Sequence, residues 1–428
     1  MNYHTSYFRA MLTVLVALWI SASAQANSAD HPSNSSLEHW ITISRENNPA
    51  LQSTYHQWRS KQAMSQAAGS LPDPTLTFDY FIDEVQTRTG PQQSRLMLAQ
   101  KLPWFGKREL DAAIAGSAAN LAEQDLVQTQ LQLTQQLTHL WADGVYVEVD
   151  TLLTRENLAL LEQIERIART RYRLARTSHP DLIRIQLQRS KVENQVTNLQ
   201  TRRLGLASRL AAISRQPVSS TFSWPVSFPS LAALASEQAL QERLQGHNPG
   251  LQKLRFQNEM RHSQIKQAEL QGRPDITVRY GRIFTGAAVM PGTEGSGEDP
   301  QYVGVGINIP LWVSKIQHLE NAAHQAKMES EFQLTAAALN LENELNSALY
   351  KLQNAEQQLV RYQQELIPQA ENVLTTLIKA YQTGNSDFSD LLETEKLLLD
   401  LKREQANLKR NRWKAHADVM ALIGKTDG

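Results

Sequence analysis

Residues 102–107 read Leu-Pro-Trp-Phe-Gly-Lys, and residues 309–315 read Ile-Pro-Leu-Trp-Val-Ser-Lys. Each stretch ends a strand-like region that begins after a Pro-Asp pair, at Pro72–Asp73 in the first half and at Pro274–Asp275 in the second. A long helical pattern follows each. Because self-similarity at a spacing of roughly 200 residues indicates two copies of one structural unit, the sequence predicts a tandem duplication.

The strand-like runs have one apolar and one polar face in each copy, since their residues alternate with period two. We expect strands at residues 75–84 and 94–103, and again at 275–284 and 301–310. About ten residues is the length that a tilted transmembrane strand needs. A half-buried sheet in a soluble domain is the commoner origin of such a pattern, but the flanking helices leave no domain to cover the sheet. The residues predicted to face lipid are Leu76, Phe78, Tyr80, Val303, Val305 and Ile307.

Long helices are expected after both hairpins, at residues 107–176 and 315–383, and each is followed by a turn and a return helix. Leu and Ala residues between Leu341 and Leu359 alternate in spacings of four and three, which is the heptad seam typical of coiled coils. A helix this long must pack laterally on other long helices. Pro368 predicts a kink in the second long helix.

The order of these elements divides the chain into four parts. Residues 1–26 have the short apolar run and the Ala-Gln-Ala cleavage site of a signal peptide, which predicts export. Residues 27–214 form the first repeat, and residues 232–428 form the second. The segment 215–231, which is rich in Pro and Ser, is expected to link the copies on the outside of the helical body.

Composition excludes several classes of function. The chain has 43 basic and 43 acidic residues, so no bulk attraction to nucleic acid is expected. The absence of Cys excludes disulfides, thiolate metal sites and cysteine nucleophiles. The 11 His show no spacing that would hold a metal strongly, so we predict no metal site and no cofactor. Because no nucleophile elbow, zinc-hydrolase motif or phosphate loop occurs, the chain is not expected to be an enzyme.

The predicted strands are too few for one chain to close a barrel, because the smallest transmembrane barrels have about eight. A single chain would leave unpaired strand edges in lipid, where unsatisfied backbone groups are costly. Several chains must therefore contribute strands to one barrel. Two-, three- and four-fold closure all satisfy the strand count.

Four motifs resemble the TolC-type outer-membrane efflux factors. They are Pro72-Asp73-Pro74, the strand exit at residues 100–108, the Ile-Pro-Gln-Ala-Glu-Asn-Val-Leu stretch at 367–374 and the turn at 380–393. The resemblance covers nearly the whole chain after the signal peptide. The Leu-Pro-Trp-Phe-Gly-Lys-Arg form of the exit is most similar to the heavy-metal cation branch, the CzcC/CusC-like proteins.

This resemblance implies a fold, an assembly and partners. The implied fold is mainly α with a membrane β-barrel portion, and a homotrimer forms a twelve-stranded barrel continuous with an α-helical periplasmic tunnel. The resemblance implies contact with outer-membrane lipid, docking to a periplasmic adaptor (membrane fusion) protein and an inner-membrane RND-type pump, and an equatorial position for segment 215–231. The implied function is a passive duct of a tripartite efflux system, with heavy-metal cations as the expected cargo.

The resemblance also implies an acidic constriction at the periplasmic end of the tunnel. Asp390 and Glu393 match the acidic positions that ring this constriction, and their spacing of three puts both carboxylates on one helical face. Repeated by symmetry, they would favour cations. A solvated acidic helix face is the alternative interpretation.

A latch between neighbouring helices is implied by the same turn. Tyr381 matches a tyrosine that ties the closed entrance, with packing in the tunnel wall as the alternative. The Arg of the family pattern corresponds to Ser386 here. Asp181 and Arg184, at the first turn, are therefore the expected compensating pair.

Three aromatic residues are candidates for the girdle at the membrane surface. Trp104 and Trp312 end their strands on the periplasmic side, and packing at the junction of barrel and tube is the alternative role for both. Tyr302 starts the last strand and is expected at the interface with lipid.

Other functions remain open to this sequence. A duct for drugs or for type I secretion would have the same architecture and a different cargo. A structural coiled-coil protein of the envelope would explain the helices, but it has no reason to carry two amphipathic hairpins at matching positions.

Overall fold

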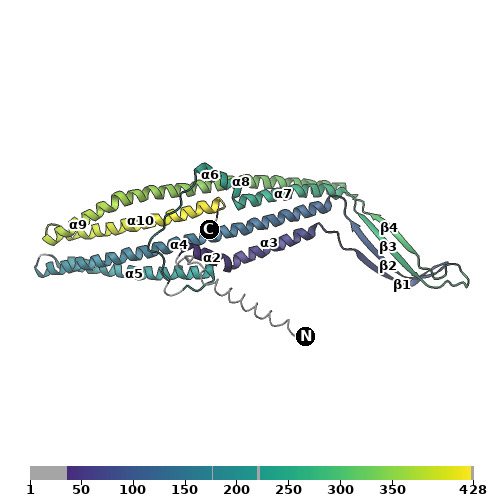
Figure 1. Cartoon of the computed structure of the whole chain (residues 1–428), viewed down its shortest axis with the longest axis horizontal. Coiled ribbons are helices and arrows are strands. Elements are labelled where there is room, and N and C mark those ends of the chain that lie inside the picture. Colours follow the sequence, from purple (N-terminus) through teal and green to yellow (C-terminus); the bar gives the residue numbers. More distant parts are fainter. Residues whose placement is uncertain (1–35, 176, 219–221, 426–428) are drawn as a thin grey trace, which may run out of the picture.

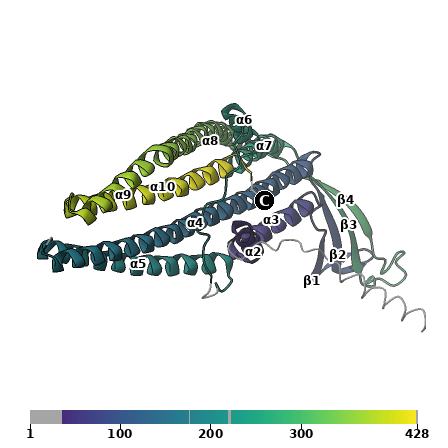
Figure 2. The same ribbon diagram turned by 60° about the vertical axis from the view of Figure 1, so that its left-hand side comes forward.

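The computed structural model describes residues 36–175, 177–218 and 222–425, and the expected signal peptide lies outside them. The described chain is long and narrow, with helices along most of its length and a sheet at one end (Figures 1 and 2). The helices are α2 (Leu37–Asn47), α3 (Pro49–Ala68), α4 (Lys107–Arg173), α5 (His179–Ser214), α6 (Glu237–His247), α7 (Pro249–Glu269), α8 (Val313–Arg361), α9 (Ile367–Thr383) and α10 (Phe388–Leu422), with a 3-10 turn at Leu270–Gly272 and a π-helical turn at Tyr362–Leu366.

The strands form one antiparallel sheet in the order β1-β2-β3-β4, so that β1 and β4 are its open edges. Their bounds are Thr75–Thr87 for β1, Gly90–Leu102 for β2, Ile276–Thr285 for β3 and Gln301–Ile307 for β4. The prediction of a mainly α-helical chain with one hairpin in each copy is confirmed.

The first hairpin differs in detail from the expectation. Residues 85–93 have turn-type composition, yet the strands extend to Thr87 and resume at Gly90, so the connection is a tight turn. The hydroxyl of Thr87 donates to the carbonyl of Gly90 at 2.6 Å and closes it. The irregularity lies instead between Tyr80 and Val85, where the register shifts. In the second hairpin, β4 ends three residues earlier than expected, at Ile307.

The same pair of residues organises the start of both copies. Asn48 and Asn248 each separate two helices, and the side-chain oxygen of each caps the second helix at its N-terminus. Pro follows each Asn in the first turn, where its missing N–H is not needed. The amide nitrogens donate to the carbonyls of Ile213, at 3.2 Å, and Leu422, at 2.8 Å. Each Asn therefore joins the start of its copy to the end of that copy's return helix.

The helices continue the order of the strands in a single layer. Near the sheet, α3 packs on α4, α4 on α7, and α7 on α8. Because α3 leads into β1, α4 follows β2, α7 leads into β3 and α8 follows β4, this is the same order as in the sheet. Toward the other end, α5 packs on α4 and α10 packs on α4, α8 and α9 (Figure 2). One edge of the chain thus consists of β1, α3 and α5, and the other of β4, α8 and α9.

The second long helix changes geometry where Pro368 predicts a kink. A π-helical turn at Tyr362–Leu366 separates α8 from α9, and Pro368 occupies the first turn of α9. Proline has no N–H and its ring crowds the preceding turn, so a widened turn at this place relieves the clash.

The described part of the linker is anchored on α4. Trp224 is 2% exposed, and its ring occupies the space where a side chain at Gly144 would project. Phe222 stacks edge-on against Trp224, and its carbonyl accepts a hydrogen bond of 2.7 Å from Arg203 on α5. The linker therefore packs tightly on the helical body.

Replacing Gly144 with Ala should displace Trp224 and destabilise the helical body by about 1–3 kcal/mol, the usual cost of overpacking. Gly205→Ala is the matched control, because no atom lies within 4 Å of a Cβ at this helical position. The control should be neutral or stabilising, since Ala favours helix over Gly. Thermal unfolding followed by circular dichroism measures both, and equal melting temperatures for the two variants would contradict this packing.

Candidate functional site

The sheet has one apolar face that no described element covers. The strand register places Leu76, Leu98, Tyr280 and Val303 in a row across all four strands. These four residues are 47–74% exposed. All six residues predicted to face lipid lie on this face: Leu76, Phe78, Tyr80, Val303, Val305 and Ile307.

The opposite face of the sheet is polar. Arg95 donates to Asp79 on the neighbouring strand at 2.7 Å. Tyr302 also lies on this face, where its ring covers Gly281, its partner in the register. Tyr302, expected at the interface with lipid, thus lies on the opposite face of β4 from Val303. Adjacent residues of a strand point to opposite faces, and the space above Gly281 receives the ring.

The sheet joins the helices through Asp275, a residue to which the sequence pattern assigns no role. The carboxylate of Asp275 accepts from the backbone N–H of Trp104 at 3.0 Å and from the ammonium groups of Lys107 at 2.8 Å and Lys101 at 3.1 Å. Its backbone carbonyl accepts from the N–H of Asn308 at 3.2 Å. Burial by itself would raise the pKa of Asp275, but the hydrogen bonds from Lys107, Trp104 and Lys101 lower it to about 2.

The two candidate girdle tryptophans have different surroundings. Trp104 is half-buried beside Asp275 and packs edge-on against Phe105. Trp312 is 74% exposed at the other edge of the chain. Within one chain, only Trp104 packs at the junction of sheet and helices.

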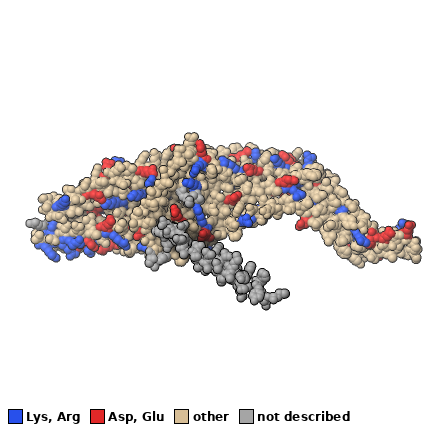
Figure 3. All heavy atoms as spheres, in the orientation of Figure 1, with Lys and Arg blue, Asp and Glu red and all other residues tan. Residues whose placement is uncertain are grey.

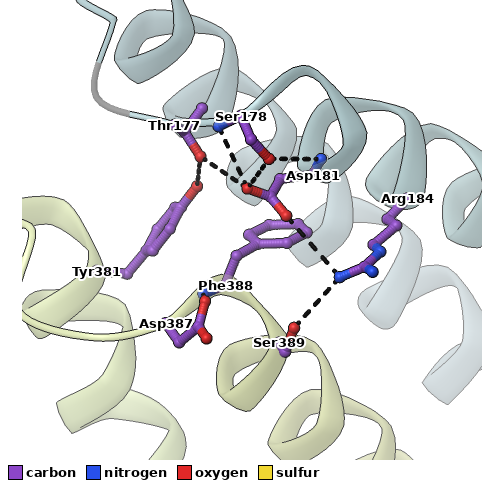
Figure 4. A network of polar contacts seen from close by, with 8 residues as sticks. All are labelled: Thr177, Ser178, Asp181, Arg184, Tyr381, Asp387, Phe388 and Ser389. Atoms are coloured by element: carbon purple, nitrogen blue, oxygen red, sulfur yellow. Dashed lines mark hydrogen bonds and ion pairs between the residues drawn. The ribbon is translucent and has the colours of Figure 1, made fainter.

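Tyr381 contacts the first repeat (Figure 4), at the end of the molecule distant from the sheet (Figure 1). It is 2% exposed, and its hydroxyl lies 3.5 Å from that of Thr177. The guanidinium of Arg171 lies 4.5 Å from the centre of its ring and donates to its backbone carbonyl. Tyr381 therefore holds the two helical tips of one chain together, by packing and by hydrogen bonding.

Asp181 and Arg184 lie in the same network, with separate roles. Asp181 forms a capping box with Ser178 at the start of α5, in which the Ser178 hydroxyl donates to the carboxylate at 2.5 Å. Arg184 lies 3.9 Å from this carboxylate and donates to Ser389 of the second tip at 3.4 Å. Because Arg184 is exposed, this ion pair contributes little to stability. Figure 3 shows Lys and Arg side chains gathered over this tip, where α4 meets α5.

Asp390 and Glu393 lie together on the exposed side of α10, away from the Tyr381 network. Neither makes a hydrogen bond or ion pair with another described residue. Ser386, at the position of the family Arg, donates to the carbonyl of Leu377 at 3.3 Å and stays within its own tip. Both carboxylates are thus available to solvent or to another molecule.

A polar seam joins the copies between α4 and α10. Arg403 donates to Asp150 at 2.7 Å, and Lys414 lies 2.7 Å from Asp143. Nearer the tip, Glu395 is 1% exposed between Leu391 and Leu398, and neither of its carboxylate oxygens has a hydrogen-bond partner among the described residues. The heptad pattern contains the signal that could have identified it, an acidic residue at an apolar seam position.

The environment of Glu395 favours its neutral form. Burial, with the added repulsion of Asp400, raises its pKa to about 7 against the opposing influence of Asn157 and Arg403. The native state holds this proton more tightly than an unfolded chain, in which the pKa of the Glu395 carboxyl has its ordinary value of 4.5. The protonated carboxyl therefore makes its full contribution to stability below pH 4.5. It is lost as pH rises through about 7.

Glu395→Gln should therefore stabilise the protein at pH 8, by on the order of 1–3 kcal/mol, and leave it unchanged at pH 4.5. Glu393→Gln, two residues away and exposed, is the matched control and should have no pH-dependent effect. Melting temperatures across this pH range decide the matter. A Glu395→Gln curve parallel to that of the unmodified protein would show that the pKa of Glu395 is the same in the folded and unfolded states, and would contradict the raised pKa.

Comparison with known proteins identifies the architecture. Residues 240–425 match the model of the outer membrane efflux protein family. The structure is similar to the outer membrane protein VceC of Vibrio cholerae, with 18% identity, a TM-score of 0.76, and coverage of 92% of this chain and 97% of that one. The chain has the fold of the outer-membrane efflux channels.

Two further solved structures support this assignment. CusC has 13% identity, a TM-score of 0.78, and coverage of 91% of this chain and 92% of that one. The MtrE outer membrane channel of Neisseria gonorrhoeae has 14% identity, a TM-score of 0.75, and coverage of 91% and 89%. No curated protein sequence matches the chain significantly.

The comparisons bear on two predictions. The expectation that the chain is not an enzyme is confirmed, because the matching family is one of efflux channels. The resemblance to efflux channels is likewise confirmed, whereas CusC is one of several similar channels, so the heavy-metal branch is not distinguished. Among the described helices, none is long and apolar enough to span a membrane.

Proposed function

We propose that this chain is one protomer of a trimeric outer-membrane duct that exports solutes passively. The observation that carries the proposal is the apolar sheet face, which is uncovered and bordered by two open edges. Open edges and an apolar face are both satisfied when sheets of several copies close into a barrel in lipid. Three copies supply twelve strands, which lies within the range of known membrane barrels, about 8 to 26.

The helices support the same assembly. They follow the strand order in one layer, so a ring of sheets continues as a ring of helices. A ring of this kind uses head-to-tail contacts, in which the β4, α8 and α9 edge of one copy meets the β1, α3 and α5 edge of the next. The duct would then extend from the outer membrane into the periplasm, toward an adaptor protein and an inner-membrane pump of the RND type.

The periplasmic tips are the proposed gate. Tyr381 and Arg184 join the two tips of one chain, while Asp390 and Glu393 are left exposed. Repeated by symmetry, these carboxylates would form an acidic ring that favours cations. The proposed cargo is heavy-metal cations, which rests on the strand-exit motif alone, and a drug or type I secretion duct is the alternative.

Purified protein in planar bilayers should form ion-conducting channels. Asp390→Ala with Glu393→Ala should lower the preference for cations over anions about several-fold, since the ring of negative charge is removed. Glu329→Ala, at an exposed position on α8, is the control and should have no effect. Absence of conductance would contradict the duct and favour a structural role in the envelope.

The cargo is tested by deleting the gene and measuring sensitivity to Cu, Zn, Co and Cd salts and to a panel of antibiotics. The proposal predicts increased metal sensitivity that the unmodified gene reverses. Unchanged metal tolerance with lost drug tolerance would overturn the metal cargo and leave the duct intact.

A further inference from the structure

The two repeats of one chain contact each other at Asp275. Because the repeats are equivalent, this contact within the chain also specifies a contact between neighbouring chains in a ring. The register of the two hairpins is identical when Pro72 is matched with Pro274 and Pro103 with Pro310. Thr77, which lies opposite Met97, then corresponds to Arg279, which lies opposite Gly304. On this match, Asp73 is the equivalent of Asp275.

Asp275 has its partners, whereas Asp73 has none among the residues that the structure describes. Asp275 binds the N–H of Trp104 and the ammonium group of Lys107, where the preceding strand passes into its helix. Asp73 is exposed and makes no hydrogen bond or ion pair with another described residue. Among the described strands none lies beyond β1, which is the edge of the sheet, so Asp73 has no preceding strand beside it.

The complementary partner lies at the opposite edge. Lys315 follows β4 in the first turn of α8, next to Ser314, the residue that matches Lys107. Lys107 is the first residue of α4 and Lys315 is the third residue of α8, so both ammonium groups belong to the first turn of their helices. Lys315 is exposed and has no acidic partner among the described residues.

We infer that Asp73 of one chain binds Lys315 of the neighbouring chain in the ring. This contact repeats between chains the contact that Asp275 makes within one chain. The inference rests on the ring proposed above and adds the residues that close it. The partner is a second molecule of this chain. The charges of the two residues, their positions and the strand order at the two edges are those of the contact between the two repeats within one chain.

The same match specifies the strand register between copies. In the match, β4 corresponds to β2 and β1 corresponds to β3, so β4 of one chain pairs with β1 of the next as β2 pairs with β3. This pairing places Ile307 opposite Leu76, Val305 opposite Phe78 and Val303 opposite Tyr80. Apolar residues then meet apolar residues at these three pairs along β4. A slip of one residue would turn every side chain of β1 to the wrong face, so this agreement is an independent check on the match.

An ion pair at the end of this edge would fix the register. A slip of two residues preserves the apolar face but moves Asp73 by about 7 Å along the strand, beyond reach of a direct bond to Lys315. A charge-assisted hydrogen bond at the junction, where Asp275 is 8% exposed, is stronger than an exposed pair.

Cysteine cross-linking tests the contact, and the chain contains no other Cys. Asp73→Cys with Lys315→Cys, treated with a short bismaleimide in mild detergent, should give covalent trimers on a denaturing gel. Asp73→Cys with Lys327→Cys is the control, because residue 327 lies about 18 Å further along α8, and it should give monomers only.

The outcomes separate the inference from the proposed function. A ring in mild detergent whose first cysteine pair yields only monomers would overturn the Asp73–Lys315 contact and leave the ring intact. An unmodified chain that forms no ring would overturn the proposed function, and this contact with it.

Charge exchange provides a second test that does not depend on the reagent. Asp73→Lys and Lys315→Asp should each lower the temperature at which the trimer dissociates, and the double variant should recover most of the loss. A double variant as weak as the sum of the two single variants would show that the residues do not meet.

Discussion

The structure depends on one unsatisfied constraint: a single four-stranded sheet carries an apolar face and two unpaired edges. In water this arrangement would aggregate, and in lipid its edges would leave backbone groups without partners. No described element of the chain covers either feature. The remedy must come from outside the chain, and lipid together with further copies satisfies both the face and the edges.

The duplication determines how the helices respond to this constraint. Asn48 and Asn248 join the start of each copy to its return helix, and Asp275 joins the two copies where strands become helices. The strand order is therefore transmitted to the helices as one continuous layer. A closed sheet then requires a closed ring of helices, which is the geometry of a tunnel.

The periodic features could be predicted from the sequence. The alternation at Leu76–Tyr80 and Val303–Ile307 identified the hairpins and their apolar face, and Pro368 marked the place of the π-helical turn. The connection of the first hairpin is shorter than predicted, because turn-type residues on both sides of it belong to strand ends. The face on which Tyr302 lies could not be predicted, since its sequence position carries no signal of the glycine that its ring covers.

Long-range contacts were beyond prediction. Trp104 and Asp275 are 171 positions apart, and only the folded chain shows that the repeated Pro-Asp motif is a junction. Glu395 stands out in its heptad, but its burial depends on how α10 packs against α4. The sequence singles out Tyr381 at its turn, but its partner Thr177 belongs to the other repeat and carries no signal of this contact.

Native mass spectrometry of the protein extracted from outer membranes tests the central claim most directly, that the open sheet is closed by other copies of the same chain. The account predicts a single assembly with three times the mass of one chain, stable in detergent without any other protein. A protein that remains monomeric, or that acquires a different subunit at its sheet edges, would contradict it.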